Sequence, residues 1–294
     1  MPKRATYKVG ALNLTIHPHS AEKYAALFKD AFQFRKPLRL HGDIQGVIHT
    51  VFDLIEGHPE KGLHGNLIKY TSIDPSNPWY DVSKGKVATK QQLDELSIPD
   101  GLAPNMKWTR YFFDPVHHKI IWVCQGPGIS FSTSAVWKMF TSFFQHPTIV
   151  KDYGIPEITV EQDRDRLAQI FEMFRIEKLT IEYSRPNPDD DDDEEAEKAV
   201  EEKLRAQKIQ TVQTIYSSEH HAGISPDKST RALSRLALSN GCVRAKGKDA
   251  AGKRLEESTE NHPWSLPFRM EQQKTNLALW LPQVVPDIIK ALLK

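Results

Sequence analysis

Positively charged residues in the last third of the chain have the types and spacings suited to binding phosphate groups. Residues 228–254 contain eight of them and one acid, Asp249: Lys228, Arg231, Arg235, Arg244, Lys246, Lys248, Lys253 and Arg254. The first three are three and four residues apart and share one face of a helix, whereas the next three alternate and share one face of a strand. Because lysine and arginine contacts release counterions from any phosphate backbone, the pattern indicates a nucleic-acid surface. Ordinary solvated surface is the other interpretation of such small basic clusters.

An acidic run precedes this basic segment. Eight of the nine residues from 189 to 197 are acidic, beginning with five aspartates: Asp189, Asp190, Asp191, Asp192 and Asp193. Pro186 and Pro188 favour an extended chain in front of the run, which is therefore expected to form a loop that can reach a neighbouring surface. A solvated loop and a regulatory loop that competes with nucleic acid for the basic residues are both consistent with this pattern. A calcium loop is disfavoured because the run lacks the turn-forming glycine.

No catalytic or metal-binding motif accompanies these charges. The sequence has no glycine-rich phosphate loop, no G-x-S-x-G turn, no H-E-x-x-H helix motif and no cysteines at zinc spacing. We therefore predict no catalytic residues, no bound metal and no cofactor, and we favour a binding protein over an enzyme. A metal-dependent nuclease that assembles its site from dispersed carboxylates is an alternative, because such a site leaves no local motif.

The overall composition is that of a globular protein. Of the 294 residues, 39% are hydrophobic and 26% are charged, and the net charge is only +1, so electrostatic recognition must come from local patches. The two cysteines, Cys124 and Cys242, are far apart, which favours a reducing compartment. No stretch approaches the ~18 to 20 apolar residues of a membrane-spanning helix, and no apolar segment follows the basic N-terminus. These features predict a soluble cytoplasmic protein.

Hydrophobic periodicity predicts an α+β fold, with mixed, largely antiparallel sheets, helices packed on them and a helical C-terminal tail. Helices are expected to begin at the capping residues Ser20, Ser132 and Asp163. Three hairpins are expected, formed by residues 38–54 with 63–73, 107–113 with 119–124, and 242–248 with 253–258. We expect an α+β domain over residues 1–185, in which hairpins precede a strand-helix-strand-helix-strand block. An acidic loop and charged helix then occupy residues 186–208, and a basic C-terminal subdomain occupies residues 209–294.

Five short segments together resemble a prokaryotic domain-of-unknown-function family linked to mobile elements and antiphage defence: Gly10-Ala-Leu-Asn13, His17-Pro-His-Ser20, Arg185-Pro-Asn-Pro-Asp-Asp190, Asn240-Gly241 with Val243-Arg-Ala245, and Ser258-Thr-Glu-Asn-His-Pro263. The resemblance covers nearly the whole chain, and the family offers no assigned catalytic residues. In layout, the strand-helix block and the basic segment 244–252 are more distantly similar to the RexA component of a phage-exclusion system. RexA is a cytoplasmic DNA-binding sensor that works with a membrane partner.

The resemblance implies an antiphage role and binding to double-stranded DNA without sequence preference. We accordingly expect a DNA-binding component of an antiphage defence or phage-exclusion system, acting as a homodimer with a membrane-protein or toxin partner from the same operon. RNA in place of DNA, a nuclease, and an antitoxin-like interaction subunit stay open. The aspartate run departs from the RexA pattern, which argues against a permanently open DNA surface.

Overall fold

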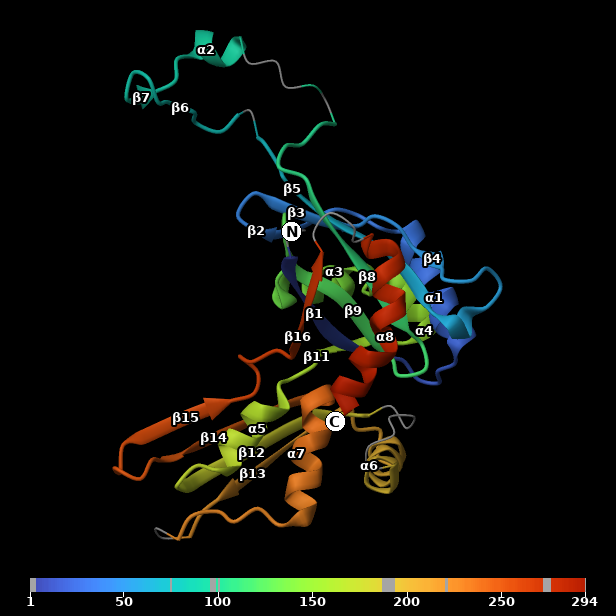
Figure 1. Cartoon of the computed structure of the whole chain (residues 1–294), viewed down its shortest axis with the longest axis vertical. Coiled ribbons are helices and arrows are strands. Elements are labelled where there is room, and N and C mark those ends of the chain that lie inside the picture. The colour runs from blue at the N-terminus through green and yellow to red at the C-terminus, as the bar shows by residue number, and fades with distance from the viewer. Residues whose placement is uncertain are drawn as a thin grey trace.

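The computed structural model describes residues 4–293 except residues 75, 96–98, 100, 187–193, 220–221 and 272–275. The described strands form two principal sheets with helices packed on them, and the chain ends in a long helix, α8 (Leu277–Leu293). Figure 1 shows the larger sheet in the upper part of the molecule and the smaller sheet below it. The α+β fold expected from the sequence is confirmed.

The larger sheet has the strand order β11-β1-β9-β8-β5-β3-β2, with β4, β10 and β16 paired at its sides. Its strands are β1 (Arg4–Thr15), β2 (Leu38–His41), β3 (Ile44–Ile48), β4 (Phe52–Asp53), β5 (Leu63–Thr71), β8 (Lys107–Asp114), β9 (Lys119–Gly126), β10 (Ile129–Ser130), β11 (Glu157–Val160) and β16 (Ser265–Glu271). Two strands pair with different parts of β1: Lys8 pairs with Pro267 of β16, whereas Leu14 pairs with Ile158 of β11. The hairpin expected from residues 107–124 is confirmed as β8 and β9.

Helices cover both faces of the larger sheet. Helices α1 (Ala21–Gln33), α3 (Thr133–Phe144) and α4 (Pro147–Tyr153) cover one face, and α8 covers the other. Alternate residues of β1 serve the two cores: Leu12 and Leu14 lie under α1 and α3, whereas Val9 and Ala11 face α8. Ser20 and Ser132 cap α1 and α3 as expected.

The smaller sheet has the order β13-β12-β14-β15, formed by β12 (Arg175–Ser184), β13 (Thr211–Ser217), β14 (Gly241–Lys248) and β15 (Arg254–Ser258). Helices α5 (Arg164–Phe171) and α7 (Lys228–Asn240) lie on the same face of this sheet, and α6 (Glu194–Ala206) lies beside them (Figure 1). Side chains such as Ile181, Val243 and Leu236 form the core between the sheet and the helices. The hairpin expected at residues 242–258 is confirmed as β14 and β15, and Asp163 caps α5 as expected.

The two sheets do not divide the chain at the boundaries expected from the sequence. The chain passes from the larger sheet to the smaller one just after β11, near residue 161, so β12 pairs with β13 and β14 although it was grouped with residues 1–185. Strand β16 and helix α8 then return to the larger sheet, although both belong to residues 209–294. Every strand pair among the described residues is antiparallel.

An arm projects from the larger sheet between β5 and β8 (Figure 1). It contains β6 (Tyr80–Asp81), β7 (Lys86–Val87) and the short helix α2 (Lys90–Asp94), and a single 3-10 turn, η1 (Pro59–Lys61), lies earlier in the chain. No helix in the described part of the chain is long and apolar enough to cross a membrane.

Candidate functional site

The strand half of the expected basic surface lies on the open face of the smaller sheet. Arg244, Lys246 and Lys248 alternate along β14 with Val243 and Ala245, which face the helices. Each of the three cations has carboxylate partners: Arg244 pairs with Glu182 (3.1 Å) and Glu260 (2.8 Å), Lys246 with Glu256 (2.9 Å), and Lys248 with Glu177 (3.5 Å). Hydrogen bonds to Glu260 and Glu182 raise the pKa of Arg244. This face therefore carries balanced rather than basic charge.

The helix half lies on the other side of the same sheet. Lys228, Arg231 and Arg235 are exposed along α7, whose opposite face packs on the sheet through Leu236 and Ala237. The Asp227 side chain caps the helix by accepting from Thr230 N at 2.7 Å. The structure thus separates the two basic stripes that the sequence suggested would form one surface, because α7 covers the face of β14 opposite to the three cations.

The remaining two basic residues of the segment lie at the far end of the smaller sheet. Lys253 follows the turn between β14 and β15, where its backbone N–H donates to Asp249 Oδ1 at 2.9 Å. Arg254 pairs in register with Lys248 and so belongs to the open face. Neither residue lines the groove between the helices.

A groove of about 400 Å³ runs between α5 and α7. It is lined by Arg164, Leu167, Ala168, Phe171, Glu172, Arg231, Arg235 and Leu238. The Arg231 guanidinium lies 4.7 Å from the centre of the Phe171 ring, and its Nε donates to Pro226 O at 3.1 Å. No carboxylate among the described residues pairs with Arg231. The groove therefore combines three arginines and an aromatic ring with one acid, Glu172.

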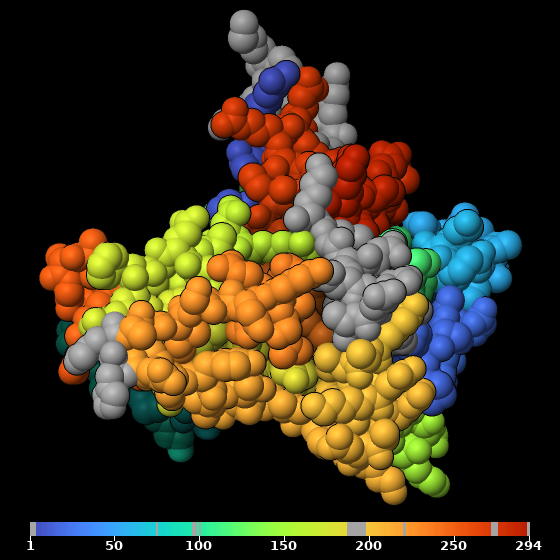
Figure 2. Space-filling view, turned by 90° about the horizontal axis from the view of Figure 1, so that it is seen from below, coloured from blue at the N-terminus to red at the C-terminus, as the bar shows by residue number. Residues whose placement is uncertain are grey.

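This groove opens on the side of the smaller-sheet layer that carries the helices. In the view from below, the orange atoms of the segment that includes α7 lie next to the yellow-green atoms of the segment that includes α5 (Figure 2). Phe174, just after α5, is 71% exposed. The sequence interpretation omitted Arg164 and Phe171, although both lie in the helix expected after Asp163 and are seven residues apart, which places them on one helix face.

The aspartates of the expected regulatory loop, Asp189–Asp193, lie outside the described residues. The segments on either side of the run are held together, because Arg185 Nε, after β12, lies 3.3 Å from Glu201 Oε1 of α6. The flanking residues Arg185 and Glu201 are thereby held together at the end of β12.

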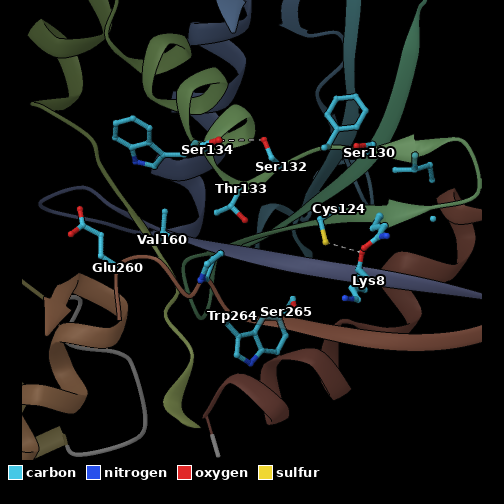
Figure 3. Close-up of a pocket in the computed structure, with 16 residues that line it drawn as sticks. Lys8, Cys124, Ser130, Ser132, Thr133, Ser134, Val160, Glu260, Trp264 and Ser265 are labelled. Carbon is cyan, nitrogen blue, oxygen red and sulfur yellow. Dashed lines mark hydrogen bonds between the residues drawn. The ribbon is translucent and has the colours of Figure 1, made fainter. Parts of the chain in front are cut away.

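A second cavity, of about 870 Å³, opens at the start of α3 (Figure 3). It is lined mainly by Lys8, Cys124, Gln125, Ser130, Ser132, Thr133, Ser134, Trp137, Glu260, Trp264 and Ser265. Figure 3 shows Ser132 to Ser134 on one side and Trp264 with Ser265 on the other. Ser132 caps α3 and its Oγ lies 3.3 Å from Ser134 Oγ, while Trp137 Nε1 donates to Ile158 O at 2.9 Å. Indole rings and hydroxyl groups therefore share this cavity.

The thiol of Cys124 lines this cavity. Burial raises the pKa of the Cys124 thiol, whose Sγ donates to Lys8 O at 3.3 Å, so the sulfur is protonated near neutral pH and is a poor nucleophile. Within the described ranges, no three His, Cys, Asp or Glu side chains are grouped so that they could hold a metal ion.

A buried polar network joins the two sheets. Lys119 Nζ of β9, in a side chain only 2% exposed, lies 2.9 Å from Glu161 Oε1 and also donates to Asn13 Oδ1 at 3.3 Å. Asn13 Nδ2 donates to Asn240 Oδ1 at 3.1 Å, and Ser239 Oγ donates to Glu161 Oε2 at 2.9 Å. Residues 13 and 240 belong to two of the segments that carry the family resemblance, and the fold brings them into contact.

Three histidine rings pack together near the start of α1, where His19 and His118 also contact Tyr24. The ring centres of His17 and His19 are 6.4 Å apart, and those of His19 and His118 are 4.8 Å apart. Burial, together with the nearby Arg185 and His19, lowers the pKa of His17 to about 4. His17 is therefore neutral at physiological pH.

The comparison with known proteins identifies one family. Its description is "Domain of unknown function (DUF4747)", and it matches residues 5–284. No curated protein matches the sequence. Because the match spans nearly the whole chain, including both sheets and about the first half of α8, the chain belongs to the DUF4747 family.

Proposed function

We propose that the protein binds nucleic acid through the groove between α5 and α7, with Arg164, Arg231 and Arg235 directed at phosphates. The observation that carries this proposal is the setting of Arg231. Its guanidinium rests on the Phe171 ring and has no carboxylate partner among the described residues. An arginine held over an aromatic ring is pre-organised, so less side-chain entropy is lost when it binds a phosphate.

The open face of the smaller sheet is a weaker candidate for the same role. A phosphate that approaches Lys246 or Arg244 must displace Glu256, Glu182 or Glu260, and the released carboxylate then repels the ligand. The described residues that line the groove include only one acid, Glu172. We therefore assign the main phosphate contacts to the helix side.

The proposed ligand is double-stranded DNA, bound without sequence preference. Contacts to phosphates fix a protein on the duplex but carry no direct sequence information. The resemblance in layout to RexA supports a role as a cytoplasmic component of antiphage defence or phage exclusion, acting with a membrane-protein or toxin partner. RNA is the other ligand with the same phosphate chemistry, so both nucleic acids belong in the test.

The experiment is a fluorescence anisotropy titration of labelled duplex DNA and single-stranded RNA between about 50 and about 200 mM salt. The variant Arg231→Ala/Arg235→Ala removes two groove cations. Its matched control, Lys36→Ala/Lys61→Ala, removes two exposed charges from the layer around α1. We expect the groove variant to reduce the slope of log affinity against log salt by about 2, because each lost phosphate contact removes about 0.9.

The control separates a local contact from a general field effect. If both double variants weaken binding equally, the groove is not the binding surface. If Lys246→Ala/Lys248→Ala has the larger effect, the open face of the smaller sheet is the binding surface instead. If the wild-type protein binds neither nucleic acid at low salt, the proposed function is wrong.

The cavity at the start of α3 supports a second candidate function, binding of a small planar ligand. Its volume of about 870 Å³ lies within the ~300 to 1,000 Å³ typical of small-molecule sites. Trp137 and Trp264 offer apolar ring surfaces, and the hydroxyls near Ser132 offer hydrogen bonds. Calorimetric titration with purine nucleosides and nucleotides, repeated on Trp137→Leu, tests this function. Binding that is absent, or that the substitution leaves unchanged, would exclude the cavity for these ligands.

A further inference from the structure

The outer strand β13 has an unusual composition for a sheet edge. Its seven residues, Thr211-Val-Gln-Thr-Ile-Tyr-Ser217, include no charged residue and no proline. The other outer strand of the same sheet, β15, carries Arg254, Glu256 and Glu257. Exposed edges usually carry charges or prolines because an unprotected edge pairs with other strands. Strand β13 therefore has the composition of a strand that has a partner.

The hydrogen-bond phase of β13 defines which of its residues face outward. Arg185 N donates to Gln210 O at 3.2 Å and Ser218 N donates to Glu177 O at 2.9 Å, so the even-numbered positions bond to β12. The odd-numbered residues then direct their N–H and C=O groups away from the sheet: Thr211, Gln213, Ile215 and Ser217. Within the described part of the chain, no hydrogen bond reaches these outward backbone groups.

We infer that β13 pairs antiparallel with β13 of a second copy of this chain, about a two-fold axis at Thr214. In this register Thr211 faces Ser217, Val212 faces Tyr216, Gln213 faces Ile215, and Thr214 faces its own copy. The outward groups of the four odd-numbered residues then form about eight hydrogen bonds across the axis. Joining the edges gives one continuous antiparallel sheet.

The side chains of the strand fit this self-pairing. A β-branched residue opposite an aromatic one, as for Val212 and Tyr216, and threonine opposite threonine are both favourable cross-strand pairs. Ile215, which is 51% exposed, is covered by the neighbouring strand. No like charges oppose each other, whereas antiparallel self-pairing of β15 about Glu256 would place that carboxylate against its own copy. The edge is thus complementary to itself, as a two-fold dimer interface requires.

A two-fold axis perpendicular to the sheet keeps the helical layers of both copies on the same side. The α5–α7 grooves of the two chains then face the same way. The pairing itself depends only on the backbone and side chains of β13, so it stands whether or not the grooves bind nucleic acid.

Crosslinking through single cysteines tests the register. In the proposed dimer, Thr214→Cys places two thiols opposite each other at a non-hydrogen-bonded pair, where the Cα atoms are about 4.5 Å apart and a disulfide can form. Val212→Cys is the matched control, because residue 212 faces Tyr216 of the other copy. The native Cys242 is buried. We expect a covalent dimer from Thr214→Cys under mild oxidation and a much lower yield from Val212→Cys.

A proline substitution tests the interface without breaking the sheet. Ile215→Pro removes an outward N–H that β12 does not use, so the monomer should keep its circular dichroism while light scattering shows loss of the dimer. If the dimer has a micromolar dissociation constant, the wild-type protein should be dimeric at about 100 times that concentration. A wild-type protein that is still monomeric there would overturn the inference. A dimer that persists in Ile215→Pro, or equal crosslinking through both cysteines, would also overturn it.

Discussion

Substitution of Lys119 by methionine should destabilise the protein strongly. Methionine keeps most of the apolar stem but removes the ammonium group that lies 2.9 Å from Glu161 and also donates to Asn13. The Glu161 carboxylate, only 6% exposed, then keeps Ser239 Oγ as its main hydrogen-bond donor. Removing one partner of a buried pair leaves an uncompensated charge, which costs about 3 to 5 kcal/mol. We expect a loss of that size in the free energy of unfolding.

The double variant Lys119→Met/Glu161→Gln should recover part of this loss. The amide is neutral and its oxygen can still accept from Ser239, so no buried charge remains unpaired. We expect the double variant to be at least ~2 kcal/mol more stable than the sum of the two single losses predicts. The matched control is Lys246→Met, which breaks the exposed pair with Glu256 and should cost less than about 1 kcal/mol.

The assay is equilibrium unfolding in urea, followed by both tryptophan fluorescence and circular dichroism. Because Lys119 belongs to the larger sheet and Glu161 leads into the smaller one, the single variant should also separate the two probes into two transitions. A loss below about 1 kcal/mol in Lys119→Met, or a double variant that shows only additive losses, would refute the role of this pair.

Three further variants test other parts of the protein. The folded-state pKa of His17, about 4, lies below its ordinary 6.5, so the native protein binds fewer protons and its stability should fall as pH decreases from about 6.5 to about 4. Urea midpoints across this range should show a smaller slope for His17→Gln, and an unchanged slope would contradict the assignment. Gly241→Ala places a Cβ 2.0 Å from Glu182 O, so the free energy of unfolding should fall by about 1 to 3 kcal/mol, whereas an unchanged melting temperature would show that the strands can separate. If the acidic run competes with DNA for the groove, replacing Asp189–Asp193 with alternating Gly and Ser should tighten DNA binding at low salt. The gain in affinity per charge removed should exceed that of the control Asp152→Ser, and this difference should vanish at high salt.

The local elements of the fold could be predicted because their signals are local. Ser20, Ser132 and Asp163 each accept a hydrogen bond from a backbone N–H two or three residues later. Serine and aspartate are typical helix-capping residues, so the sequence itself indicates where these helices begin. The β8–β9 hairpin has a similar origin, since Asp114 Oδ1 accepts from Val116 N within the turn. The assignment of strands to sheets lacks such a signal. Lys8 pairs with Pro267, which is distant in the sequence. This pairing is determined by the packing of the cores on both faces of β1 and not by a local sequence signal.

The candidate site was predictable only in part, because the basic residues of α7 were identified whereas Arg164 and Phe171 of α5, and the surface that they form with α7, were not. Spacing correctly places Arg244 and Lys246 on one face of a strand, yet the partners of Arg244 come from other segments, 62 residues before it and 16 residues after it. Periodicity also cannot distinguish the buried Lys119 from an exposed hairpin lysine. Burial of its ammonium requires Glu161, which is adjacent only after β11 pairs with β1.

The positions of the charged residues in the fold determine which of them neutralise each other. A net charge of +1 with 39 basic and 38 acidic residues means that nearly every cation could in principle be neutralised. Strand pairing neutralises those of β14, because cross-strand neighbours such as Lys246 and Glu256 are held in register. On the outer side of α7, Arg231 has no carboxylate partner among the residues that the structure describes, and its guanidinium instead lies against the Phe171 ring. The same local excess of basic residues therefore yields a salt-bridged sheet on one side and an exposed arginine groove on the other, so the number of basic residues in a segment is a poor measure of its affinity for phosphate.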